Sequence, residues 1–269
     1  MEALPLNLPD ILNKVEKAAL NAGRFIKEEF GKIRAHQAEV KSLNSLVSYV
    51  DREAEKMIVE ALDDLIEEVG YITEEDTTIN QRKYRNWIID PLDGTTNFLK
   101  GIPVFSVSIA LTEGDEVMVG VVYDVMQDWC FSAYKGGGAF LNRQPISVSE
   151  VKVLDKAVIA TGFPYERLTA DSPVFHTLKN VIEKSSGIRR LGSAAIDLAY
   201  VSCGKVEGYY ESGLNPWDLA AGILLVKEAG GIISDMNGGT AVLTHGSVIA
   251  SNPEIHPQLE NVLREHHLA

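Results

Sequence analysis

The sequence of 269 residues predicts a protein of mixed α and β structure (α/β, with an α+β first half), in which sheets are layered between pairs of helices. Three observations predict this class. Apolar side chains recur at helical spacing in the first 70 residues, residues 86–134 form a run of strands with short turns, and the second half alternates strands with helices. The change of pattern predicts a boundary near residues 145–155, which separates an N-terminal α+β part, 1–148, from a C-terminal α/β part, 149–269.

Two helices are expected at the start of the chain. Over residues 8–30 the apolar positions follow one helix face, with Asp10 as the expected N-cap and Gly31 as the end. A second helix is predicted over residues 46–69 after a short extended lead, with Gly70 as its end. The brief apolar segment YIT then reads as a strand.

The next segments predict one long sheet. Four runs rich in β-branched and aromatic residues are joined by short turns, namely NWIID, FSVSIAL, EVMVGVVYD and WCFSAY. Residues 135–145, KGGGAFLNRQP, are expected to form a hairpin. Its glycines indicate turn positions with positive φ and not a phosphate loop, because no Lys-Ser or Lys-Thr follows at the required spacing.

The second half is expected to alternate strands and helices. The expected strands are AVIATGF, VEGYYES, GIISD and SVIAS. The expected helices run from Asp171 or Ser172 to near Gly187, from Ser193 to Gly204, from Asn215 to Gly230, and over residues 256–267. Proline follows the expected N-cap of two of them, where its missing N–H is tolerated.

The composition limits the classes of function. A formal net charge of -13 argues against nucleic acid as the main ligand, since no basic surplus exists to displace counterions. Cys130 and Cys203 have no metal-ligand or redox spacing. The first residues do not resemble a signal peptide, and no apolar run approaches the ~18 residues that a membrane helix needs. We therefore expect a cytoplasmic protein with no membrane partner.

Four acidic residues, two of them in the stretch WIIDPLDGTTNF, lie at the expected ends of strands or the start of a helix. Asp90 and Asp93 follow an apolar strand, Glu74 follows the strand YIT, and Asp218 lies in the first turn of an expected helix. Each acid alone has an ordinary explanation as a turn residue, a helix-end charge or a surface charge. Together they favour a site at the carboxyl ends of strands, where α/β sheets bind ligands. Oxygen ligands without His or Cys suit Mg²⁺, and two or three ions would relieve the repulsion between the carboxylates.

The residues after Asp93 suggest phosphate chemistry. The hydroxyl of Thr95 can hold a metal-bound water in line with a phosphorus atom, and Asp51 could take the proton through it. The backbone N–H groups of Gly94 and Thr95 can hold phosphate oxygens. The carbonyl of Leu92 can turn into the same space as the carboxylates.

Four motifs together resemble the inositol monophosphatase family of lithium-sensitive, Mg²⁺-dependent phosphatases. They are TEEDT, DPLDGTTNF, FSVSIAL and NPWDLAAGILLVKEAGG, which occur in that order over nearly the whole chain. The resemblance implies the α-β-α-β-α sandwich of sugar phosphatases, usually a homodimer. It also implies a metal site formed by Glu74, Asp90, Asp93, the Leu92 carbonyl and Asp218.

The resemblance further implies catalytic and substrate-binding residues. Catalysis would involve Glu74, Asp93, and Thr95 supported by Asp51. The implied substrate-binding residues are Lys41, Gly94, Thr95, Gly192, Ser193, Ala194, Glu211 and Asp218. Arg189 and Arg190, before LGSAA, could meet the substrate or a dimer partner.

Two positions depart from the family pattern. Ser45 stands where the family often has an acid, which affects the expected outer, third-metal region. Thr73 stands where glycine is common before Glu74.

The predicted function is hydrolysis of a myo-inositol monophosphate, or a similar sugar phosphate, to the alcohol and inorganic phosphate. Fructose-1,6-bisphosphate and 3'-phosphoadenosine 5'-phosphate are alternative substrates. A regulatory, partner-binding protein on the same fold is the alternative from another class. A phosphatase of this family would also be inhibited by lithium.

Overall fold

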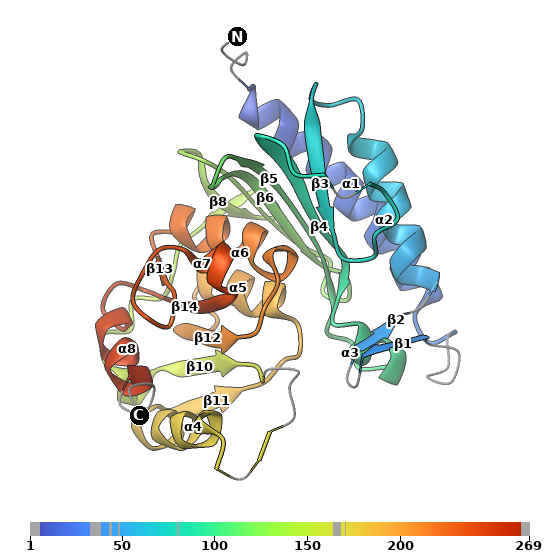
Figure 1. The fold of residues 1–269 in the computed structure, drawn as a ribbon. Helices are drawn as coiled ribbons and strands as arrows, with labels where there is room; N and C mark the ends of the chain where they lie inside the picture. The colour runs from blue at the N-terminus through green and yellow to red at the C-terminus, as the bar shows by residue number, and fades with distance from the viewer. Residues whose placement is uncertain are drawn as a thin grey trace.

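The computed structural model describes residues 6–32, 39–42, 45–47, 49–79, 81–163, 168–169 and 171–264. Within residues 39–47 it describes the backbone alone. Two large sheets and three pairs of helices form five layers (Figure 1).

The helices lie in three pairs, one outside each sheet and one between the sheets (Figure 1). In order across the layers the pairs are α1 (Leu8–Glu29) with α2 (Tyr49–Leu62), α5 (Ala194–Ser202) with α6 (Pro216–Glu228), and α4 (Pro173–Lys184) with α8 (His256–Arg264). This arrangement confirms the predicted α-β-α-β-α sandwich. Within the described residues, no helix is both long and apolar enough to cross a membrane.

The larger sheet has seven strands in sequence order from β3 to β9. Its strands are β3 (Val69–Thr73), β4 (Arg85–Asp93), β5 (Ser106–Glu113), β6 (Glu116–Asp124), β7 (Trp129–Tyr134), β8 (Gly138–Leu141) and β9 (Gln144–Ile146). The β3–β4 pair is parallel and all the other pairs are antiparallel. The two parallel strands therefore end at the same edge of the sheet.

The smaller sheet has five strands in the order β11-β10-β12-β14-β13. Its strands are β10 (Val158–Thr161), β11 (Gly187–Arg189), β12 (Gly208–Ser212), β13 (Ile232–Ser234) and β14 (Ser247–Ser251). The first three in this order are parallel, and β14 is antiparallel to both of its neighbours. A separate pair of short strands, β1 (Glu39–Ser42) and β2 (Ser45–Val47), lies near the short helix α3 (Thr95–Lys100) (Figure 1).

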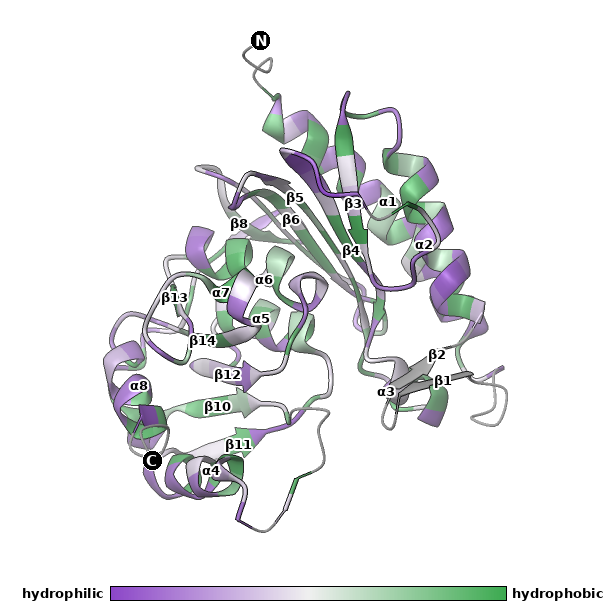
Figure 2. Cartoon of the chain, viewed as in Figure 1, coloured by the Kyte–Doolittle hydropathy of each residue, from purple (hydrophilic) through white to green (hydrophobic). Residues whose placement is uncertain are grey.

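Four hydrophobic clusters fill the spaces between the five layers. On β5 the side chains of Val107, Ile109 and Leu111 face α1 and α2, whereas Ala110 faces the central helices. Strands covered on both faces carry mostly apolar runs, and the two buried serines of FSVSIAL, Ser106 and Ser108, face the central helices. Figure 2 shows these strands and the central helices as mostly hydrophobic, with polar residues on the outer surfaces of the outer helices.

Small residues bring α6 close to the larger sheet. A Cβ atom at Gly120 on β6 would lie 2.9 Å from the carbonyl oxygen of Ala221. Within the central layer, a Cβ atom at Gly222 would lie 2.5 Å from the Leu198 side chain. The residues Ala221 and Gly222 of α6 therefore fit between the sheet and α5 because their side chains are small or absent.

Several predicted boundaries were wrong, for local reasons. The N-cap of α1 is Asn7 and not Asp10, which lies inside the first turn. Helix α2 ends at Leu62, and Gly70 lies within β3, where a Cβ atom would collide with the backbone of Gln81. Several short elements were not predicted, among them β1, β11, α3, the 3-10 turn Leu154–Lys156 and α7 (Val242–His245). Segments of three to six residues are too short to show a repeating apolar pattern.

Candidate active site

The parallel pairing of β3 and β4 brings the first two acids together. Thr73 is the register partner of Ile89, and the next residue, Glu74, donates its backbone N–H to the Ile89 carbonyl over 3.2 Å. Glu74 and Asp90 therefore leave adjacent strands at the same edge, where their carboxyl groups contact each other.

The buried Glu55 of α2 fixes the loop that carries Glu74. Its carboxylate accepts the backbone N–H groups of Glu75 and Thr77, each over 2.8 Å, and the Thr77 hydroxyl over 2.6 Å. An acid that looks like an ordinary helix residue in the sequence thus replaces missing backbone partners in the turn after β3.

A β-bulge places Asp90 and Asp93 on one face of the sheet. Residues three apart on a regular strand point to opposite faces. Here Asp90 pairs with Ser108 and Asp93 pairs with Ser106, so three steps on β4 match two steps on β5. The extra residue turns both carboxylates toward the central helices, and Pro91 is tolerated because a bulge interrupts the ladder.

Asp218 reaches the same space from the N-terminus of α6. Asn215 and Asp218 form a capping box, in which Asp218 Oδ2 accepts the Asn215 backbone N–H over 2.6 Å. The buried Ser108 hydroxyl donates to the carbonyl of Trp217 over 3.1 Å and fastens this helix start to β5. As a result Asp90, Asp93 and Asp218 offer carboxylate oxygens that all lie within 4.8 Å of one another.

The N-terminus of α5 holds one oxygen of Asp93. Asp93 Oδ2 accepts the Ser193 hydroxyl over 2.6 Å and the Ala195 backbone N–H over 2.8 Å. Ser193 is the N-cap of α5, and its hydroxyl also lies 3.2 Å from that of Ser106. These contacts fix the carboxylate of Asp93 between the sheet and the central helices.

Burial and mutual repulsion raise the pKa values of the three clustered acids. Burial is the main cause for Asp90, whose pKa is raised well above its ordinary value, with Glu74 and the other two acids adding to the rise. Burial raises the pKa of Asp93 to about 6, although the hydrogen bonds from Ser193 and Ala195 oppose it. The pKa of Asp218 is also raised by burial and by Asp93. The cluster therefore repels negative charge and favours a bound cation.

The donor set fits a hard divalent cation. The clustered groups are carboxylates, and Mg²⁺ takes oxygen ligands, whereas zinc prefers His and Cys. A divalent ion would compensate the charges that burial now disfavours. Glu74, Asp90, Asp93 and Asp218, with the Leu92 carbonyl, are the residues that would hold it.

Thr95 lies beside this cluster at the first residue of α3. Its hydroxyl is 3.0 Å from Asp51 Oδ1 and 3.0 Å from the carbonyl oxygen of Leu92. Gly94 precedes it with φ of 97°, and a Cβ atom there would lie 3.0 Å from the Val104 carbonyl. The structure thus places Thr95, the buried Asp51 and the Leu92 carbonyl side by side.

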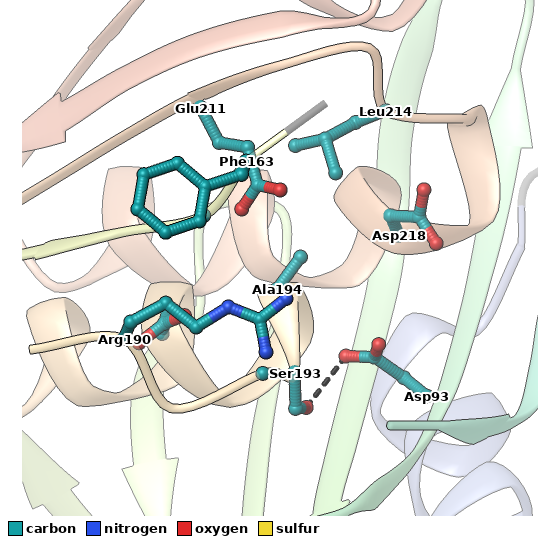
Figure 3. Close-up of a pocket in the computed structure, with 11 residues that line it drawn as sticks. Asp93, Phe163, Arg190, Ser193, Ala194, Glu211, Leu214 and Asp218 are labelled. Carbon is teal, nitrogen blue, oxygen red and sulfur yellow. Dashed lines mark hydrogen bonds between the residues drawn. The ribbon is translucent and has the colours of Figure 1, made fainter. Parts of the chain in front are cut away.

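A pocket extends from the carboxylates toward the smaller sheet (Figure 3). It is lined by Asp93, Gly162, Phe163, Arg190, Gly192, Ser193, Ala194, Asp197, Glu211, Leu214 and Asp218. The empty space in it is about 390 Å³ with the open solvent at its mouth included. Figure 3 shows the carboxylates of Asp93 and Asp218 on one side of it and Glu211 with Phe163 on the other.

Glu211 forms the far wall of the pocket. Its Oε2 accepts the Tyr209 hydroxyl over 2.6 Å, and burial raises the pKa of Glu211 to about 7. Gly162 leaves room for it, because a Cβ atom at this position would collide with the Glu211 carboxylate and displace that side chain. The predicted substrate residues Gly192, Ser193 and Ala194 also line the pocket.

Some pocket residues were missed in the sequence, and some predicted ones cannot be placed. Asp197, which was missed, lines the pocket. Of the two arginines named as possible substrate contacts, Arg190 lines the pocket, whereas Arg189 donates from its guanidinium to the carbonyl of Ile188. The signal for Asp197 was an acid in the apolar helix SAAIDLAYVSCG. The side chains of Lys41 and Ser45 lie outside the described residues.

The comparisons with known proteins cover almost the whole chain. The model of the family described as "Inositol monophosphatase family" matches residues 8–268. A Mesorhizobium japonicum protein named "Inositol-1-monophosphatase" is 41% identical over 95% of this chain and 96% of its own length. A Pasteurella multocida protein named "Nus factor SuhB" is 39% identical over 94% of this chain and 96% of its own length.

The solved structures agree with this match. The crystal structure of the extragenic suppressor protein suhB from Bartonella henselae superposes with a TM-score of 0.90 at 41% identity, and covers 95% of this chain and 99% of that one. The fold, the order of motifs and the family match all point the same way, and the protein belongs to the inositol monophosphatase family.

Proposed function

We propose that this protein is a Mg²⁺-dependent phosphomonoesterase that hydrolyses myo-inositol monophosphate, or a similar polyol phosphate, to the alcohol and inorganic phosphate. The reaction class follows from membership of the inositol monophosphatase family. The choice of substrate is supported by relatives of about 40% identity named "Inositol-1-monophosphatase".

One observation carries the proposal. Three carboxylates from two distant parts of the chain, Asp90 and Asp93 on β4 and Asp218 on α6, converge within 4.8 Å, and the hydrogen-bonded pair of Thr95 and Asp51 accompanies them. An acidic protein attracts a phosphate ester only where bound cations reverse the local charge. A pocket opens from the same carboxylates toward Glu211.

Bound Mg²⁺ ions, two or three in number, would neutralise the acids, balance the charge of the phosphate and make water a better nucleophile. The chain itself orients the other participants. Thr95 can donate its proton to Asp51 and use its oxygen lone pairs to hold the attacking water. Ser193 and the Ala195 N–H hold Asp93 in place, and Glu211 lies where it can meet a hydroxyl of the alcohol.

Two structural predictions accompany this function. We propose that the chain acts as a homodimer, as the family resemblance implies. The division into residues 1–148 and 149–269 is also a proposal, supported by the end of the larger sheet at Ile146 and the start of the smaller one at Val158.

A phosphate-release assay tests the function directly. The wild-type protein with Mg²⁺ should release phosphate from inositol monophosphates faster than from fructose-1,6-bisphosphate or 3'-phosphoadenosine 5'-phosphate, and chelation should stop the reaction. Asp93→Asn should abolish turnover with an unchanged circular dichroism spectrum. Asp115→Asn, in the exposed turn before β6, is the matched control and should retain full activity. Normal turnover by Asp93→Asn would remove the site assignment.

The relatives named "Nus factor SuhB" support a second candidate function. In this case the chain would be a regulatory protein that acts through a partner surface on the same fold. Absence of turnover for every ester in the panel, from a folded protein supplied with Mg²⁺, would favour this role over the phosphatase.

A further inference from the structure

The pocket contains a buried acid that the proposed chemistry does not use. Asp197 lies on α5, one turn after the N-cap, and its backbone N–H donates to the Ser193 carbonyl over 3.0 Å. Only 1% of the residue is exposed, yet it lines the pocket together with Glu211 and Arg190. Asp197 Oδ1 is buried and has no hydrogen-bond partner among the residues that the structure describes.

An unpartnered buried carboxylate oxygen is costly. A buried acceptor without a donor loses its hydration without compensation, so nearly all such atoms in proteins are paired. Asp124 shows the ordinary case in this chain. It is as buried as Asp197, but its two oxygens accept the Tyr200 hydroxyl over 3.0 Å and the Gln127 N–H over 3.3 Å. The exception at Asp197 falls on the wall of the pocket, which points to a donor supplied by a ligand.

The charges around Asp197 indicate what kind of donor this is. Glu211 and Asp93 are the neighbouring acids, and both disfavour a second negative group in this part of the pocket. A second phosphate of a bisphosphate would therefore be poorly placed here. Arg190 already supplies the positive charge on this wall, so a cationic ligand gains little. A neutral hydroxyl group, which donates without adding charge, suits the position best.

Arg190 supplies positive charge beside the two acids. Its guanidinium passes over Gly192, where a Cβ atom would come within 3.0 Å of it, and Figure 3 shows it reaching into the pocket beside Ala194. Burial, with Glu211 and Asp93, raises the pKa of Asp197 well above its ordinary value, and the positive charge of Arg190 opposes this rise. Burial raises the pKa of Glu211 to about 7, and Arg190 opposes this rise as well. The three side chains thus form one polar wall opposite the metal ligands.

We propose that Asp197 is a specificity-determining residue, whose carboxylate accepts a hydrogen bond from a hydroxyl of the alcohol half of the substrate. The inference rests on the proposed phosphatase function and names the group that distinguishes a polyol from a plain alcohol. Helix α5 also holds Asp93 through Ser193 and Ala195. The same helix would therefore position both the polyol ring and a metal ligand.

Steady-state kinetics with two substrates test the inference. Inositol monophosphate offers ring hydroxyls, whereas cyclohexyl phosphate has the same ring without them. For Asp197→Asn, kcat/KM for inositol monophosphate should fall roughly tenfold, mainly through KM, because the hydrogen bond loses its charged acceptor. The value for cyclohexyl phosphate should stay within about twofold. Asp124→Asn is the matched buried control and should leave the ratio of kcat/KM between the two substrates unchanged.

Thermal unfolding separates a substrate contact from a structural role. Removing an unpartnered buried charge should leave the Tm of Asp197→Asn unchanged or raise it, whereas a structural acid would lower it. If this variant does not fold, Asp197→Ala leaves no polar atom to bury and should show the same substrate-selective loss.

Three outcomes would overturn the inference. They are an equal loss for both substrates, no loss for either, and a lowered Tm with unchanged selectivity. A wild-type protein that hydrolyses neither ester would instead contradict the proposed function itself, and thus the two failures are distinguishable.

Discussion

The raised pKa values of the clustered acids predict an unusual pH dependence of stability in the metal-free protein. Asp93 has a pKa of about 6 when folded, against an ordinary 3.8. A carboxyl group with a raised pKa binds more protons in the folded state than in the unfolded state. The free energy of unfolding is therefore greatest below the ordinary pKa and falls as the pH rises through the folded one.

The size of the effect follows from the shift. A difference of about two pKa units corresponds to roughly 3 kcal/mol in the free energy of unfolding. This stability is lost as the pH rises from about 4 to above 6, and about half of it is lost between pH 5 and pH 7.5. For a chain of this size about 1.5 kcal/mol lowers Tm by roughly 3–6 °C. Asp90 and Asp218 have pKa values raised in the same direction and add to the fall.

Differential scanning fluorimetry with and without Mg²⁺ measures this effect. After chelation, Tm should be several degrees higher at pH 5 than at pH 7.5. Excess Mg²⁺ at pH 7.5 should restore the lost stability, since a ligand at about 100 times its Kd contributes roughly 2.7 kcal/mol. Protons compete with the ion for the carboxylates, and the gain from Mg²⁺ at pH 5 should be smaller.

Asp93→Asn is the informative variant in this experiment. It removes one buried charge but keeps an oxygen that can accept from Ser193 and Ala195. The metal-free variant should be more stable than wild type at pH 7.5, and Mg²⁺ should stabilise it little. The reasoning is refuted if metal-free wild type has the same Tm at both pH values, or if Mg²⁺ raises the Tm of both proteins equally.

Three further predictions concern the pocket and the metal site. Gly162→Ala should displace the Glu211 carboxylate from its hydrogen bond with Tyr209 and raise KM for inositol monophosphate between about twofold and tenfold. An unchanged KM would show that Glu211 does not contact the substrate. Ser108→Ala removes the hydrogen bond to the Trp217 carbonyl, and the Mg²⁺ concentration for half-maximal activity should rise roughly tenfold; an unaltered Mg²⁺ titration would contradict this positioning role. Lithium at millimolar concentration should inhibit at high Mg²⁺, as the family resemblance implies, and rates that do not respond to lithium would count against it.

The elements of the fold were largely predictable because their signals are local. The apolar periods of two and 3.6 residues, the N-cap Asn215 with Pro216, and the glycine after α6 depend only on neighbours in the chain. The same holds for the acids at the ends of β3 and β4, which mark the edge of the sheet where the site lies. The cytoplasmic location and the outer metal region near Lys41 and Ser45 are still predictions.

The sequence by itself determined which groups are available: carboxylates and a hydroxyl in place of His or Cys, at strand ends and helix starts. Only the tertiary structure decided how they meet. The spacing of Asp90 and Asp93 would place them on opposite faces of a regular strand, and the bulge that reunites them is visible only against Ser106 and Ser108 of β5. Likewise, the isolation of the Asp197 oxygen depends on which distant residues surround it. Burial and register arise from contacts between segments far apart in the chain, and no local pattern encodes them.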